Sequence, residues 1–374
     1  MAPSVPPSSR PSSIPSFSPS SDPSAVPTAT PTEPPTMPPT QQPTYPPINS
    51  KSDLEAAITT WSSTGSSIYG PIGNWNVSQV NNFYGLFLGN SAFNDDISGW
   101  QTSQVTDMSY MFYGARGFNQ DLATWDVSRV TTMLGMFHDA RAFNQDLATW
   151  DVSSVTSTYS MFAYTQAFKQ DLATWDVSRV LDMSFMFHNA PGFNQDLATW
   201  DVSRVTNMGQ MFYNAQAFDK DLSNWDVSRV TTMIEMFFGA QAFNQDLSNW
   251  DVSGVFWFRQ MFNGASAYNT NLCAWSDKIQ THDMGSMFSG TGCPEQASPS
   301  FIAPNLVSPL CNVCSISCCP DHHTNRTTYD VSNRTSNGST NGTTNDASNR
   351  TADKPTDGTA YDASNPTAYV PSNQ

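Results

Sequence analysis

The sequence predicts an α/β solenoid, a stack of nine coils of 25 residues that each hold a strand, a bend and a short helix. Three observations predict this class: a tryptophan that returns every 25 residues, a Met–Phe pair that keeps the same period, and apolar spacing that changes within each copy. A unit this short cannot bury its own apolar face, so the copies are expected to stack. The repeated tryptophans are Trp75, Trp100, Trp125, Trp150, Trp175, Trp200, Trp225, Trp250 and Trp275.

The third copy illustrates the elements expected in each coil. Trp125 and Val127 alternate with polar neighbours, which is typical of a short strand with one face inward. After a bend, apolar residues recur at the spacing of one helix face, and the methionines among them are expected to fill the core. These residues are Val130, Met133, Met136, Phe137 and Ala140.

Residues 51–74 are expected to form an N-terminal helical cap. Ser52 and Glu55 stand at the spacing of a capping box, which marks a helix start. The helix would present one apolar face to the open end of the first coil, and so would act as a lid. That face consists of Leu54, Ile58 and Trp61.

Composition divides the rest of the chain. Residues 1–50 are rich in Pro, Ser and Thr and are expected to form a disordered arm, because they cannot bury enough apolar surface. The repeat solenoid is predicted over 75–292, followed by a cysteine-rich segment over 293–320. Residues 321–374, rich in Asn, Thr and Ser, are expected to form a disordered tail.

The charge balance excludes some partners. The net charge of −16 disfavours nucleic acid and anionic membrane surfaces, since both require a basic face. No apolar run approaches the ~20 residues of a transmembrane helix. The first residues, MAPSVPPSSR, show no signal peptide, which conflicts with the signs of secretion described below and leads us to expect a shortened start.

The C-terminal part carries two signs of an extracellular setting. An even number of cysteines favours three disulfides over a zinc site, which requires two separated pairs. The cysteines are Cys273, Cys293, Cys311, Cys314, Cys318 and Cys319. His322 and His323 follow them and are a second candidate for metal binding. Glycosylation sequons indicate a glycoprotein, and they start at Asn76, Asn325, Asn333, Asn337, Asn341 and Asn349.

One aspartate per copy forms a column that has two interpretations. Stacked carboxylates would repel each other and could bind cations such as calcium, or they could cap the bend on a solvated face. The second interpretation is favoured, since an arginine three positions on in several copies offsets the charge. The candidate metal stripe is Asp126, Asp151, Asp176, Asp201, Asp226 and Asp251.

Two more polar columns are expected to be structural. A second set of aspartates is predicted to turn onto its own backbone, as are the neighbouring Asn119 and Asn144. These aspartates are Asp96, Asp121, Asp146, Asp171, Asp196, Asp221 and Asp246. One serine per copy is predicted to bond at the bend or to cap the helix. The serines are Ser78, Ser103, Ser128, Ser153, Ser178, Ser203, Ser228 and Ser253.

A few positions break the repeat. Phe258 is expected to take a buried methionine position, while Phe256 and Trp257 project outward or, as we prefer, pack under the C-terminal cap. Exposed aromatics of this kind could otherwise anchor a ligand. His138 and His188 are expected to be surface neighbours of the repeat helices.

The stretch LATWDVSRVTTMLGMFHDARAFNQD resembles the repeat of BspA-like leucine-rich-repeat surface proteins. It is most similar to a subgroup catalogued as a domain of unknown function in mycoplasma surface proteins, and the resemblance covers about residues 53–291. Val130 stands where the leucine-rich frame has asparagine, so a straighter stack without an asparagine ladder is expected. The resemblance implies secreted or surface proteins with proposed roles in adhesion and protein binding, and it provides no catalytic residue.

Three functions follow as hypotheses. The first is a non-catalytic extracellular or cell-surface scaffold that presents a repetitive surface to a protein or glycan ligand. The alternative is a structural wall or matrix protein in which the solenoid is a self-assembling spacer. The third, an enzyme acting on wall polymers, needs a constellation that breaks the repeat, and the irregular Lys169, Lys220 and Tyr159 form none. No cofactor is expected, calcium apart, and the oligomeric state stays open.

Overall fold

The computed structural model describes residues 45–275, 278–279, 283–293, 301–302 and 305–306. Its regular elements are the helix α1 (Lys51–Thr64), two 3₁₀ turns (Ile72–Asn74 and Cys273–Trp275) and the strands β1 (Phe301–Ile302) and β2 (Asn305–Leu306). The two strands pair antiparallel, with Phe301 opposite Leu306.

The predicted disordered arm and tail lie almost wholly outside the described residues, as does most of the cysteine-rich segment. The chain divides into two units, Met1–Pro320 and Asp321–Gln374, and every described residue belongs to the first.

Helix α1 begins two residues earlier than the predicted capping box. Ser50 is the N-cap: it has an extended backbone, and its hydroxyl accepts the N–H of Asp53 at 3.1 Å and donates to the Asp53 carboxylate at 2.7 Å. The expected box of Ser52 and Glu55 is therefore wrong, because Ser52 already lies within the helix. Glu55 instead pairs with Lys51 at 2.8 Å.

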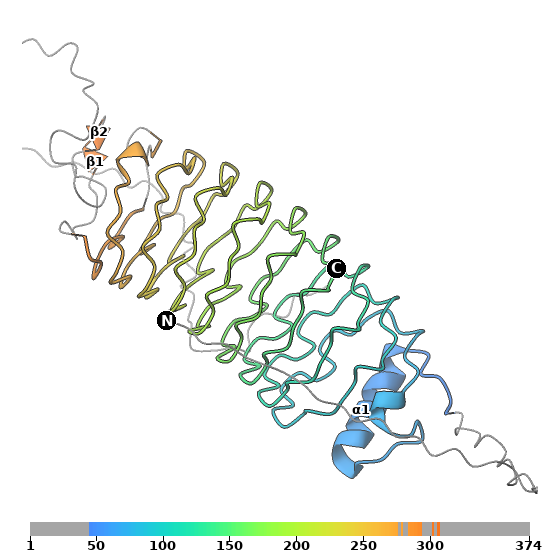
Figure 1. The fold of residues 1–374 in the computed structure, drawn as a ribbon. Helices are drawn as coiled ribbons and strands as arrows, with labels where there is room; N and C mark the ends of the chain where they lie inside the picture. Colours follow the sequence, from blue (N-terminus) through green and yellow to red (C-terminus); the bar gives the residue numbers. More distant parts are fainter. Residues whose placement is uncertain (1–44, 276–277, 280–282, 294–300, 303–304, 307–374) are drawn as a thin grey trace, which may run out of the picture. The chain divides into compact units, whose positions relative to one another are not determined.

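The inward face of α1 is the predicted one. Leu54 and Ile58 are buried, and the Trp61 ring lies edge-on to Trp75 with 6.1 Å between centroids. The Trp61 indole N–H also donates to a carboxylate oxygen of Asp95 at 2.7 Å. Helix α1 thus lies at one end of the described stack and packs on its first coil (Figure 1).

Successive copies lie directly on one another (Figure 1). One residue of each copy forms a parallel bridge with its equivalent in the next copy. The bridges join Asn82, Asp107, Thr132, Ser157, Asp182, Asn207, Thr232, Trp257 and Asp283 in series. The offset is 25 residues except in the last bridge, where the extra residue of the final copy makes it 26. The copies are therefore stacked in register.

The tryptophans stand in file, as predicted. Trp100 stacks on Trp75 at 6.2 Å and on Trp125 at 6.5 Å, with planes within 15° of parallel. From Trp100 onward, each indole N–H donates to a backbone carbonyl of the preceding copy, as Trp150 does to Leu122 at 3.0 Å. The hydrogen bond fixes the orientation of the ring. It also satisfies the buried indole N–H, which would otherwise cost desolvation free energy.

Two files of phenylalanines complete the interior. Phe112 stacks on Phe137 at 5.5 Å in one file, and Phe118 stacks on Phe143 at 6.0 Å in the other. Within one copy, Phe112 and Phe118 stack at 3.9 Å, so the files contact each other. One hydrophobic core runs from Ile48 to Cys293.

In the described residues, the coils contain neither the predicted strand nor the predicted helix. The Trp125 amide bonds back to Leu122 within its own copy. Thr132 is the one residue of this copy that forms parallel β-bridges, to Asp107 and Ser157. In the expected helix, Gly135 and Asp139 both have φ of 54°, which an α-helix cannot contain. Their N–H groups donate to the next copy at 2.8 Å each, instead of to the preceding turn.

The left-handed positions recur in every copy and explain part of the sequence. Because only glycine adopts this conformation without strain, and Asn and Asp tolerate it best among the others, such residues are enriched there. The second left-handed position of each copy holds Gly89, Gly114, Asp139, Tyr164, Asn189, Asn214, Gly239, Gly264 and Gly290. This column marks a turn. Its enrichment in Gly, Asn and Asp is the feature of the sequence that argues against a helix.

Candidate binding surfaces

The candidate metal stripe caps the bends. Asp126 accepts the backbone N–H of Ser128 at 3.1 Å and the Ser128 hydroxyl at 2.6 Å. These bonds, helped by the charge of Arg129, lower the pKa of Asp126. The same backbone bond, at 3.0 to 3.2 Å, is made by Asp151, Asp176, Asp201, Asp226 and Asp251. The geometry matches the bend-capping interpretation.

The residues that the structure describes contain no group of three or more His, Cys, Asp or Glu side chains that could hold a metal ion. Calcium binding at the stripe therefore stays a prediction that no geometry supports. The serine column has the expected structural role at the bend, although no helix follows it.

The second aspartate column is confirmed as a turn column. Asp121 accepts the N–H of Ala123 at 2.8 Å, and Asp96 accepts that of Ser98 at 2.9 Å. The bonds from Ser98 lower the pKa of Asp96. The same turn recurs at Asp146, Asp171, Asp196, Asp221 and Asp246.

The neighbouring asparagines correct two expectations. The Asn119 side-chain oxygen accepts the N–H of Asn144 at 2.9 Å, and Asn144 accepts that of Lys169 at 3.0 Å. These side chains bridge adjacent coils instead of turning onto their own backbone. An asparagine ladder thus exists, displaced from the Val130 position where the leucine-rich frame would have it. Lys169 interrupts the ladder because its side chain offers no acceptor.

Two rows of threonines face solvent, which the sequence did not indicate. Thr131 is exposed, and its hydroxyl donates to the Thr106 carbonyl of the preceding copy at 3.1 Å. The oxygen lone pairs and the methyl group are left on the surface. The first row is Thr106, Thr131, Thr156, Thr206 and Thr231, with Leu181 in the middle. The second row is Thr124, Thr149, Thr174 and Thr199.

The two histidines lie inside a row of aromatic rings, which corrects the expected surface position. His138 stacks on Tyr113 at 4.2 Å, and His188 stacks on Tyr213 at 4.5 Å. The Tyr164 ring lies between the histidines, 5.2 Å from each. Burial lowers the pKa of both His138 and His188 to about 4.

Two columns of equivalent residues run beside this row, one from Arg116 to Gln216 and one from Asp139 to Asn214. Their side chains change from charged to uncharged along the stack. In two early copies they hold the ion pairs of Asp139 with Arg116 at 2.8 Å and with Arg141 at 2.6 Å. Burial would raise the pKa of Asp139, but the hydrogen bonds from Arg141 and Arg116 lower it overall. In the next three copies the same columns hold only uncharged residues.

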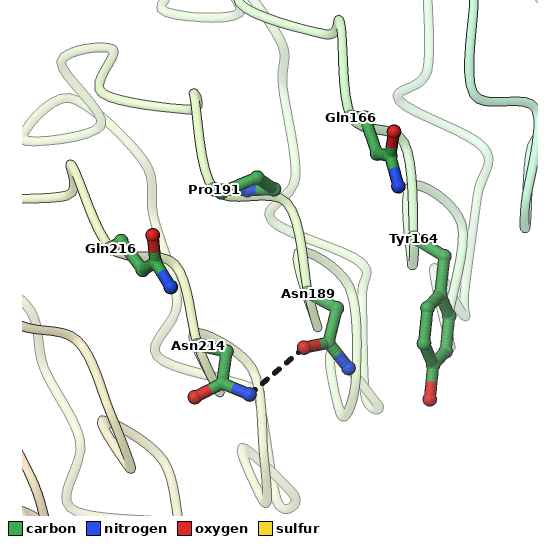
Figure 2. Close-up of a pocket in the computed structure, with 6 residues that line it drawn as sticks. All are labelled: Tyr164, Gln166, Asn189, Pro191, Asn214 and Gln216. Atoms are coloured by element: carbon green, nitrogen blue, oxygen red, sulfur yellow. Dashed lines mark hydrogen bonds between the residues drawn. The ribbon is translucent and has the colours of Figure 1, made fainter.

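Those uncharged residues line a surface hollow of about 250 Å³. Figure 2 shows them in two parallel rows, one on each side of the hollow. The Asn214 side-chain amide donates to the Asn189 side-chain oxygen at 3.0 Å. The lining residues are Tyr164, Gln166, Asn189, Pro191, Asn214 and Gln216.

The structure confirms part of the prediction for the aromatic residues that replace the usual Thr-x-Met in one late copy. Phe258 is fully buried, in the position of the usual methionine. Phe256 and Trp257 project outward, with 54% and 52% of their surface exposed. The preferred packing under a C-terminal cap concerns a segment that lies mostly outside the described residues.

Of the C-terminal candidates, only the first two cysteines are described. Cys273 and Cys293 both take part in disulfide bonds, and Cys293 is buried. Cys311, Cys314, Cys318 and Cys319 lie outside the described residues, so the pairing stays a prediction. Asn76 is exposed, and its side-chain oxygen accepts the N–H of Ser78 at 3.2 Å. The other five sequons and His282, His322 and His323 also lie outside.

The stacked copies and their recurring columns define a tandem-repeat protein. The family model described as "Mycoplasma protein of unknown function, DUF285" matches residues 55–175, 122–220 and 193–300, and the chain belongs to this family. No curated protein and no solved structure matches the chain. Among the described residues, no helix has the length and apolarity needed to cross a bilayer.

Proposed function

We propose that this protein is a non-catalytic scaffold of the extracellular space or cell surface, which binds a protein or glycan through its repeated columns. Its fold is a solenoid without regular strands or helices in the coils, and its wider relatives are the BspA-like leucine-rich-repeat surface proteins. The resemblance of the repeat and the predicted sequons support the location.

The threonine rows carry the proposal. Thr106, Thr131 and Thr156 present the same hydroxyl and methyl groups in three consecutive copies, and each hydroxyl is oriented by a backbone carbonyl. Successive groups stand about 4.8 Å apart, the spacing of paired backbones. A regular, pre-oriented and uncharged surface binds a repeating ligand at many weak contacts, whose effects multiply.

The test is binding of the full chain to arrays of glycans and surface proteins, with and without calcium. Saturable binding is expected, and it should fall sharply when Thr131 and Thr206 are both replaced by lysine. The column already accepts Leu181, so the substitutions should leave the fold intact. Lysines at Ser154 and Gln79, in a column with several arginines, are the matched control. Absence of saturable binding by the wild type would contradict the proposal.

The alternative, a self-assembling spacer, has less support. A spacer that grows end to end needs two open ends, whereas α1 packs on the first coil through Leu54, Ile58 and Trp61. Light scattering over a wide range of protein concentration distinguishes the two: the scaffold keeps a constant mass, and the spacer grows with concentration.

A further inference from the structure

We infer that the hollow beside Tyr164 is a binding site for a neutral carbohydrate, a class of ligand within the proposed function on which this inference rests. The lining of the hollow differs from the residues that earlier copies carry in the same columns. Arg116 and Arg141 precede Gln166 in one column, and Asp139 precedes Tyr164 in the other. Ionic side chains thus give way to aromatic and amide groups.

Pro191 creates the space. It stands in its column between Gln166 and Gln216, whose side chains are longer, and Figure 2 shows it between the two glutamines. The proline ring is compact and cannot reach across the gap to the asparagine row. The resulting volume of about 250 Å³ is below the ~300–1,000 Å³ of pockets for drug-sized ligands, so it suits one or two rings of a longer chain.

Tyr164 provides the apolar wall of the hollow. Tyr164 is 41% exposed as a residue, and the ring centroids of His138 and His188 lie 5.2 Å from its own, one on either side. A sugar ring has one face of C–H groups, which loses contact with water when it packs on an aromatic ring. A ring that is already held in place loses little conformational entropy on binding.

The amides provide the polar partners. The bond from Asn214 to Asn189 uses one donor and one acceptor, which leaves the Asn189 amide N–H groups and the Asn214 oxygen available. The side-chain amides of Gln166 and Gln216 make no hydrogen bond within the described part of the chain. A sugar hydroxyl both donates and accepts, and so do these amides, which makes the two sets complementary.

The lining excludes charged ligands. It contains no ionisable group apart from the tyrosine phenol, so a carboxylate or sulfate would lose its hydration without gaining a counter-charge. The net charge of −16 adds long-range repulsion of anionic polymers. The ligand is therefore expected to be an uncharged, hydroxyl-rich ring.

Gly239 supports the geometry from the next copy. Its φ is +64°, and a Cβ atom added there would overlap the Asn214 side-chain oxygen. The glycine thus leaves the room in which the Asn214 amide takes its observed orientation.

The experiment uses the full chain and tetrasaccharides of glucose, mannose and N-acetylglucosamine as probes, observed through the side-chain amide NMR signals of Asn189 and Asn214. At least one probe should shift these signals. Tyr164→Ala should weaken binding by about tenfold or more because it removes the stacking wall. Pro191→Gln should do the same by filling the hollow with the residue that the adjacent copies carry.

Tyr84→Ala is the matched control, since this tyrosine is 42% exposed and lies outside the hollow. Melting temperatures verify that each variant folds. The inference is overturned if no probe shifts the two amides, if Pro191→Gln binds like the wild type, or if uronic-acid oligosaccharides bind as tightly as neutral ones.

Array binding of Pro191→Gln separates this inference from the broader function. A variant that loses tetrasaccharide binding but still attaches to the arrays supports the hollow and leaves the threonine rows as the main surface. Tetrasaccharide binding by a wild type that attaches to no array supports the hollow and contradicts the proposed scaffold.

Discussion

At the residue scale, the two histidines show how far stacking changes a side chain. In His138 and His188 the Nδ1 atom is buried without a hydrogen-bond partner in the described structure, and burial holds the pKa of both rings near 4. Asp139 favours protonation of His138, but less strongly than burial opposes it. Both rings are therefore neutral parts of the aromatic row at neutral pH.

We expect acid to destabilise the protein through these rings. The folded-state pKa is about 4 and the unfolded one 6.5, so the unfolded chain binds more protons between these values. The contribution of the two histidines to the free energy of unfolding should be constant above pH 6.5. It should fall as the pH drops towards 4, by up to about 3 kcal/mol per histidine.

Urea unfolding at several pH values measures this effect. Replacing His138 and His188 by phenylalanine should flatten the pH dependence, and the substitution fits because Phe238 already stacks on Tyr213 at 4.6 Å in this row. An unchanged slope in the double variant would show that other groups, such as Asp126 and Asp139 with their lowered pKa, dominate.

A second prediction concerns the left-handed backbone. Gln210 has φ of 56°, and its N–H donates to the Ile234 carbonyl at 2.8 Å. Gln210→Val should destabilise the protein by about 2 kcal/mol, since a β-branched residue is strained there, and Gln210→Gly should stabilise it slightly. Thermal unfolding gives both values. Gln241→Val, at an exposed position without positive φ, is the control and should have little effect.

At the scale of the element, α1 depends on its cap and its contact with the first coil. The helix has 14 residues, which is marginal for an isolated helix, so its stability comes from Leu54, Ile58 and Trp61 packing on the stack. The backbone hydrogen bonds of α1 lie within the helix, whereas N–H groups in the turns of the coils bond to the next copy.

Ser50→Ala should lower stability by about 1 kcal/mol, with faster amide exchange confined to α1. Ser52→Ala should have a much smaller effect, although the sequence motif had placed the cap there. Hydrogen exchange of the amides of Lys51–Thr64 measures both variants. A larger loss from Ser52→Ala would contradict the observed cap, in which Ser50 bonds to Asp53.

At the scale of the whole described stack, stability is a sum over copies and their interfaces. Each copy donates backbone hydrogen bonds to the next and stacks its Trp and Phe rings on it, so the copies are interchangeable units. An insertion or deletion is tolerated only where it preserves this register.

Removing residues 218–242 should therefore leave a folded, shorter stack, because the new junction of Ala217 with Phe243 repeats the natural Ala242–Phe243 sequence. Removing residues 218–229 should disrupt the stack at this point and destabilise the protein strongly, since the copies on either side of the deletion would lose their partner residues. Circular dichroism and thermal melting compare the two deletions. Equal loss of structure in both would show that the copies are not independent units.

The sequence by itself determined the period, the residues that face inward and the presence of a terminal helix. The residues that it predicts to face inward, such as Trp125, Met136 and Phe137, are buried. The aspartate and serine columns were also predictable, because each turn closes on a residue two positions away.

Only the tertiary structure decided the backbone path and the side-chain rows. Apolar spacing of three and four residues suits a helix, but it equally suits a series of turns whose N–H groups reach carbonyls about one period away, as Phe137 does to Met161. The local sequence cannot distinguish these, because the partner belongs to another copy. The asparagine ladder, the buried histidines and the hollow at Pro191 likewise arise from contacts between copies.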